Sequence, residues 1–69
     1  MLIATQGSNQ LYFTDNEDFI AVQNNSVVLF RGKKQYIMGV YPSMERAQSA
    51  LKDALKGYKD NGILEFPKE

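Results

Sequence analysis

The residue types that most often carry out proton transfer and nucleophilic attack are missing from this 69-residue chain. It has no histidine, the commonest general base near neutral pH, and no cysteine, a frequent nucleophile. The serines fall in expected turns, at a strand start, at a helix cap and on a helix flank, and none has a base beside it: Ser8, Ser26, Ser43 and Ser49. We therefore predict no catalytic and no cofactor-binding residues, and a protein that is not an enzyme.

A run of polar residues, Asp15 to Asp18, places three carboxylates close together. Such oxygen ligands suit a hard cation, but the run lacks the spacing and the central glycine of a calcium loop. Asp and Asn are also frequent in hairpin turns, where their side chains hydrogen-bond the nearby backbone. Without cysteine or histidine, the usual zinc ligands are absent as well. We therefore interpret the run as a solvated turn and predict no metal site.

Six basic residues fall into two groups that could contact phosphates. One group is spaced i, i+4 and i+7 and would form a ridge on a helix: Lys52, Lys56 and Lys59. The other group occupies an expected turn: Arg31, Lys33 and Lys34. The chain has eight basic and eight acidic residues, whereas a protein that coats nucleic acid usually carries a basic excess. Nucleic-acid binding is therefore an alternative function and not the leading one.

A helix over about residues 43–61 is the clearest element of the sequence. Ser43 can accept a hydrogen bond from the first helical turn, and Asn61-Gly62 tolerates the positive φ at which helices often end. The residues between them form one apolar stripe: Ala47, Ala50, Leu51, Ala54, Leu55 and Tyr58. We expect residues 63–69 to form an extended tail, which Pro67 confines to a sheet edge or to a path across the helix.

Turn signals at intervals of roughly eight to ten residues divide residues 2–41 into short segments rich in β-forming residues. The expected strands are Leu2–Thr5, Gln10–Thr14, Phe19–Gln23, Ser26–Arg31 and Gln35–Tyr41. Asn24-Asn25 is the sharpest turn signal, because asparagine tolerates the left-handed conformation of two-residue hairpin turns. We predict one small α+β domain over residues 1–69: an antiparallel meander of four or five strands with one C-terminal helix packed on one face.

The last two expected strands are apolar on both faces. One helix can cover only one face, so the other should stay exposed unless a partner covers it. The alternation predicts that the exposed set is Val28, Phe30, Ile37 and Tyr41, or the opposite set. A chain this short has a marginal core and here no disulfide to support it, so we expect a homodimer or contact with a host protein.

The sequence holds no run of about 18 or more apolar residues, so we expect no membrane contact through a spanning helix. Its first residues, Met1 to Gln6, lack the basic flank and the long apolar stretch of a secretory signal. We therefore expect a cytoplasmic protein.

One local pattern is familiar. Y-x-[ST]-x-E-x-A-x-x-x-L is formed here by Tyr41, Ser43, Glu45, Ala47 and Leu51. With this pattern and an aromatic-proline tail, the chain resembles uncharacterised small proteins of Gram-positive bacteria and their phages. The tail departs from theirs, because Phe66 directly precedes Pro67. The resemblance implies short strands followed by one helix, and an origin in a phage or prophage.

The leading hypothesis is a non-enzymatic binding or regulatory module, phage- or prophage-related, that acts through protein–protein contacts. The first alternative is a small nucleic-acid-binding protein that uses the helix lysines. The second is an oligomer that sequesters a small ligand in a pocket between subunits. No cofactor is expected under any of the three.

Overall fold

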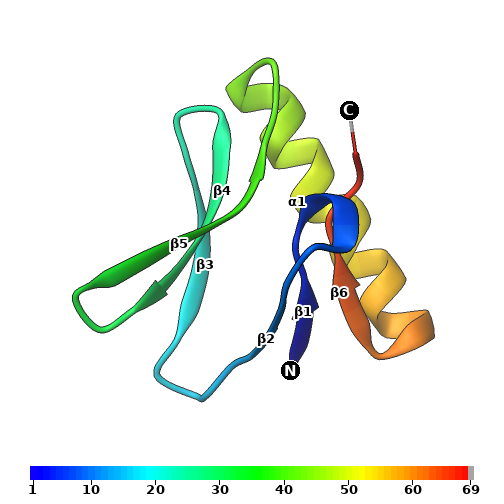
Figure 1. Ribbon diagram of the computed structural model, residues 1–69. Coiled ribbons are helices and arrows are strands. Elements are labelled where there is room, and N and C mark those ends of the chain that lie inside the picture. The colour runs from blue at the N-terminus through cyan, green and yellow to red at the C-terminus, as the bar shows by residue number, and fades with distance from the viewer. Residues whose placement is uncertain (69) are drawn as a thin grey trace.

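The computed structural model describes residues 1–68 (Figure 1). In order along the chain, its elements are β1 (Leu2–Ala4), a 3₁₀ turn η1 (Gln6–Ser8), β2 (Leu11–Phe13), β3 (Phe19–Gln23), β4 (Ser26–Arg31), β5 (Lys34–Val40), α1 (Met44–Asn61) and β6 (Ile63–Glu65). The predicted α+β class and the predicted C-terminal helix packed on strands are confirmed.

The strands form two three-stranded sheets, where the sequence suggested one meander. In the first sheet, β1 lies between an antiparallel β2 and a parallel β6. The second sheet is an antiparallel meander with the order β3, β4, β5. Residues 14–18 connect the two sheets. They form a turn closed by a hydrogen bond from Asp18 N to Asp15 O (3.1 Å), and β2 does not pair with β3.

Local signals set both ends of α1. The Ser43 hydroxyl accepts a hydrogen bond from Arg46 N (3.1 Å), which satisfies one free N–H of the first turn. Gly62 adopts φ 76° and its N–H donates to Tyr58 O (2.8 Å), as in a glycine-ended helix. No helix within residues 1–68 is long and apolar enough to span a membrane.

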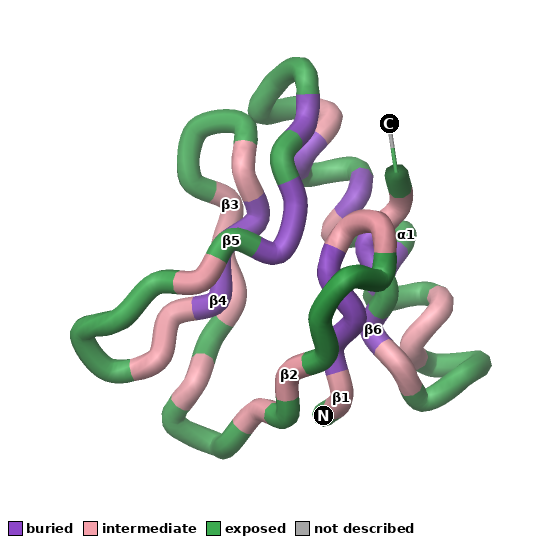
Figure 2. Tube along the Cα trace, viewed as in Figure 1, coloured by how far each residue is buried: buried purple, intermediate pink, exposed green. Residues whose placement is uncertain are grey.

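The core lies where the two sheets and the helix meet, and Figure 2 shows the buried segments gathered there. The largest fully buried side chains are Ile3, Val27, Leu29, Met38 and Leu64. The helix contributes small residues, Ala47, Ala50 and Ala54, which let its backbone approach β6, β3 and β4 closely. Each large aliphatic side chain buried in this way contributes about 1.5–3 kcal/mol of transfer free energy.

Strand β6, the first part of the predicted tail, pairs with β1 at the edge of the first sheet, and residue 69 of that tail lies outside the described residues. The carbonyl oxygen of Pro67 then accepts hydrogen bonds from the Tyr41 hydroxyl (2.9 Å) and from Gln6 Nε2 (3.3 Å). The other end of the same amide, Gln6 Oε1, accepts from Val40 N (2.9 Å). The tail and the end of β5 are therefore joined through two neutral side chains, those of Gln6 and Tyr41.

A β-bulge in β5 changes which of its side chains face the core. Val27 pairs with Gly39 but Val28 pairs with Ile37, so Met38 is an extra residue in the strand. Beyond this bulge the alternation is reversed, and Tyr41 is buried, with 2% of its surface exposed. The prediction that Tyr41 shares an exposed face with Ile37 is therefore wrong.

Candidate protein interface

The candidate site is the surface of the β3–β4–β5 sheet that points away from the core, here called the outer face. Cross-strand partners share a face, so the register assigns Phe19 with Phe30 and places Ala21, Val28 and Ile37 in the next row. The rings of Phe19 and Phe30 stack with centroids 4.8 Å apart and an angle of 11° between their planes. Phe19 and Phe30 therefore form a stacked aromatic pair on the outer face.

Much of this apolar surface is accessible to solvent. Phe19 is 59% exposed and Ile37 is 60% exposed, and Val40, whose partner is Ser26, is also exposed. In β3, β4 and β5, which the structure describes completely, every outward position is uncharged: Phe19, Ala21, Gln23, Ser26, Val28, Phe30, Gln35, Ile37 and Val40. The outer face is therefore apolar at its centre and neutral throughout.

The predicted interface residues divide between the two sides of the sheet. Phe30 and Ile37 lie on the outer face and are accessible to a partner. Val28 lies on the same face, between Ala21 and Ile37, but is buried, with 4% of its surface exposed. Tyr41 is on the core side. Val28 and Tyr41 are therefore not accessible to a partner, and their prediction as interface residues is wrong.

The sequence prediction also missed Phe19 and Val40. For Phe19 the sequence held a signal, because it alternates with the apolar residues Ile20 and Val22, and the structure places those two against the core. The outward position of Val40 depends on the bulge, for which we find no signal in the sequence.

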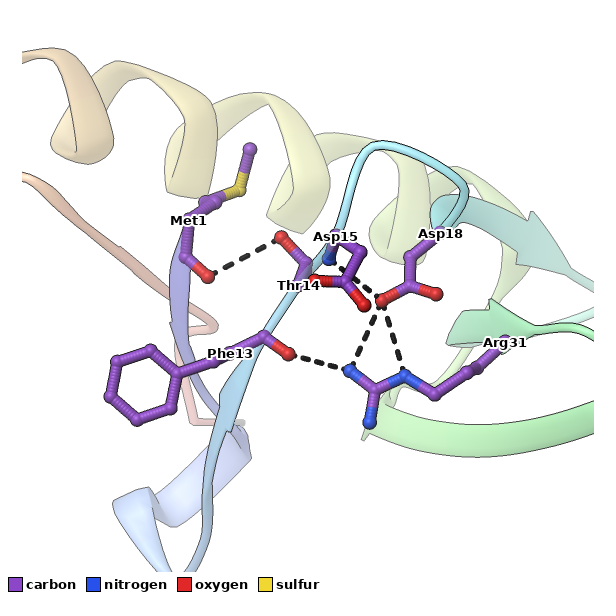
Figure 3. Close-up of polar contacts among 6 residues, drawn as sticks. All are labelled: Met1, Phe13, Thr14, Asp15, Asp18 and Arg31. Carbon is purple, nitrogen blue, oxygen red and sulfur yellow. Dashed lines mark hydrogen bonds and ion pairs between the residues drawn. The ribbon is translucent and has the colours of Figure 1, made fainter.

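A polar cluster at the end of β4 has a structural role (Figure 3). Nε and Nη2 of Arg31 each lie 3.1 Å from Oδ2 of Asp18, and Nη2 also donates to Phe13 O (2.6 Å). The same carboxylate oxygen accepts a hydrogen bond from Asp15 N (3.0 Å). That backbone hydrogen bond, and then the Arg31 guanidinium, lower the pKa of Asp18. We call this arrangement of Arg31, Asp18 and Phe13 the clamp, because it ties β2 and the loop after it to β4.

The basic residues proposed as nucleic-acid contacts do not form one surface. Lys52, Lys56 and Lys59 are exposed on α1, whereas Lys33 and Lys34 are exposed at the turn between β4 and β5. This turn and the second half of α1 lie at opposite sides of the molecule in Figure 1. Arg31 is held in the clamp, so its guanidinium is already engaged by protein oxygens.

The acidic run that was considered for a cation forms part of the same clamp. Asp18 turns inward toward Arg31, and 5% of its side chain is exposed. Among the described residues, no group of three or more histidine, cysteine or acidic side chains is placed to hold a metal ion.

Comparison with protein-family models, curated proteins and solved structures finds no match for this chain. Its function is therefore inferred from the surfaces described above.

Proposed function

We propose that the protein is a small, non-enzymatic binding module that acts through protein–protein contacts made by the outer face. One observation carries this proposal: a stacked pair of phenylalanines, with Phe19 59% exposed, lies beside Ile37, which is 60% exposed. Aromatic side chains are enriched at protein interfaces, where they anchor the contact. A contiguous apolar face on a soluble monomer is also uncommon unless a partner covers it.

A second copy of the chain is the partner that this face suits best. The outer face is neutral, so two copies can approach each other without charge repulsion. A two-fold pair would place the same residues on both sides of the contact and would enlarge a small core. A standard interface of this kind buries about 800 Å² on each partner. From the resemblance of the helix and tail, we further propose a phage or prophage origin, action in the host cytoplasm, and a host protein as a second target.

Sedimentation equilibrium tests the proposal directly. We expect the wild-type chain to have the mass of a dimer at concentrations from ~10 to ~200 μM, and Ile37→Lys to have the mass of a monomer because it would bury a charge in the contact. The matched control is Leu11→Lys, since Leu11 is 63% exposed but belongs to the other sheet. A monomeric wild type, or an Ile37→Lys variant that dimerises as well as Leu11→Lys does, would refute self-association through the outer face.

A further inference from the structure

A pocket of about 420 Å³ lies between α1, the β3–β4 strands and the loop of residues 14–18, and it borders the outer face at Phe19, which also lines it. Its inner wall reaches the core, because Leu29 and Leu64 line it and are fully buried. Leu51 and Leu55 line it from the helix. Ligand pockets in proteins usually measure about 300–1,000 Å³ and have mainly apolar walls. The size and the walls of this pocket match that class.

The pocket also explains an exposed residue of the helix. Leu55 belongs to the apolar stripe predicted to face the sheet, yet 44% of its surface is exposed. Its neighbour in the stripe, Leu51, is only partly buried. Both leucines line the pocket, so these two positions of the stripe face its opening, whereas Ala54 beside them is buried in the core.

Acidic side chains from one loop line the pocket together with the N-terminal residue, Met1. Among the described residues that line the pocket, the charged side chains are those of Asp15 and Asp18. Asp18 is hydrogen-bonded to Arg31, whereas the carboxylate of Asp15 makes no hydrogen bond to the rest of residues 1–68 and interacts with the Arg31 guanidinium through charge alone. Figure 3 shows both residues on the loop, with the Asp18 carboxylate next to the backbone nitrogen of Asp15. Asp15 is therefore the group that remains to meet a ligand at the rim.

We propose that this pocket binds a small amphiphilic amine, whose apolar body contacts the accessible helix leucines, Leu51 and Leu55, and whose cationic head lies at Asp15. An anionic head would meet the carboxylates, and a wholly polar ligand would leave the leucine walls without contacts. Asp15 is exposed, so its charge should discriminate between head groups by a factor of a few, as exposed ion pairs do. This proposal does not depend on self-association through the outer face.

The test uses four probes: n-octylammonium, n-hexylammonium, octanoate and n-octanol. Each is titrated into the folded chain below its micelle concentration, and binding is measured from the NMR chemical shifts of the backbone amides. We expect n-octylammonium to shift the amides of the pocket-lining residues and to bind about tenfold more tightly than n-hexylammonium, because two more methylenes are buried. Octanoate should bind more weakly than n-octanol, and n-octanol more weakly than n-octylammonium. Equal affinities for octanoate and n-octylammonium would overturn the proposed head-group site, and no shift of the pocket amides at low millimolar n-octylammonium would overturn the proposal as a whole.

Two variants separate the head-group contact from the apolar contact. Asp15→Asn keeps the backbone hydrogen bonds of the loop and should weaken n-octylammonium about fivefold while leaving n-octanol unchanged. Its matched control is Asp53→Asn, at an exposed helix position outside the pocket. Leu55→Asn should weaken both probes, whereas Ile37→Asn on the outer face should weaken neither. If Asp15→Asn behaves like Asp53→Asn, or if Ile37→Asn abolishes binding, the assignment to this pocket is wrong.

Discussion

The β3–β4–β5 sheet has an apolar surface on each side, but the two sides have different neighbours. On the core side, Val27 and Leu29 are fully buried against the first sheet and α1. On the outer side, Phe19 and Ile37 remain more than half exposed. The residue types are alike on the two sides, so the chain's topology decides which apolar side is free to bind a partner. On the core side, β4 ends in a charged residue, Arg31, whereas the outward positions of β3, β4 and β5 are all uncharged.

The largest expected effect comes from removing a core-facing side chain. Leu29→Ala should lower the free energy of unfolding by about 2–5 kcal/mol, because it leaves a cavity in a fully packed site. Ile37→Ala, on the outer side of the neighbouring strand, should cost no more than about 1 kcal/mol in the monomer. Urea denaturation measures both changes.

Repeating the measurement at several protein concentrations sharpens the comparison. The loss caused by Leu29→Ala should not depend on concentration. The loss caused by Ile37→Ala should grow with concentration, since a dimer is stabilised by mass action and this variant weakens the contact. Equal, concentration-independent losses would mean that the two sides have been assigned wrongly.

The second prediction concerns the bulge that reverses the two sides of β5. A Cβ added at Gly39 would lie 2.9 Å from the Cε2 and hydroxyl oxygen of Tyr41, which is too close for atoms that are not bonded. Gly39→Ala should therefore lower the free energy of unfolding by about 1–3 kcal/mol, because the Tyr41 ring must move. Gly57→Ala is the control, since no atom lies within 4 Å of the added Cβ there. If Gly39→Ala proves as mild as Gly57→Ala, the close packing of Tyr41 over the bulge is refuted.

Much of the helix could be predicted from the sequence because its signals are local. Ser43 and Gly62 each act within one helical turn, and both perform the capping roles expected of them. The bulge at Met38, the parallel pairing of β6 with β1 and the pair of Arg31 with Asp18 could not be predicted in this way. Each depends on residues that are distant in the sequence or on a strand register. The same reason explains why Tyr41 was placed on the wrong side and why the pocket was not foreseen.

The smallest expected effect on stability comes from Asp18, the partner of Arg31 at the end of β4. The pKa of Asp18 is lower in the folded chain than in the unfolded chain, because its carboxylate accepts a hydrogen bond from Asp15 N and pairs with Arg31. Ionised Asp18 therefore stabilises the fold fully above the ordinary pKa of an aspartate, and this contribution is lost as the pH falls through the lowered value. Asp18→Asn should be slightly less stable than the wild type at neutral pH and should approach it at acid pH. Thermal unfolding of the two chains between pH 2 and 7 measures the difference, with Asp53→Asn as the control. A difference between wild type and Asp18→Asn that is constant over this range would show that the clamp does not hold the two sheets through its charge.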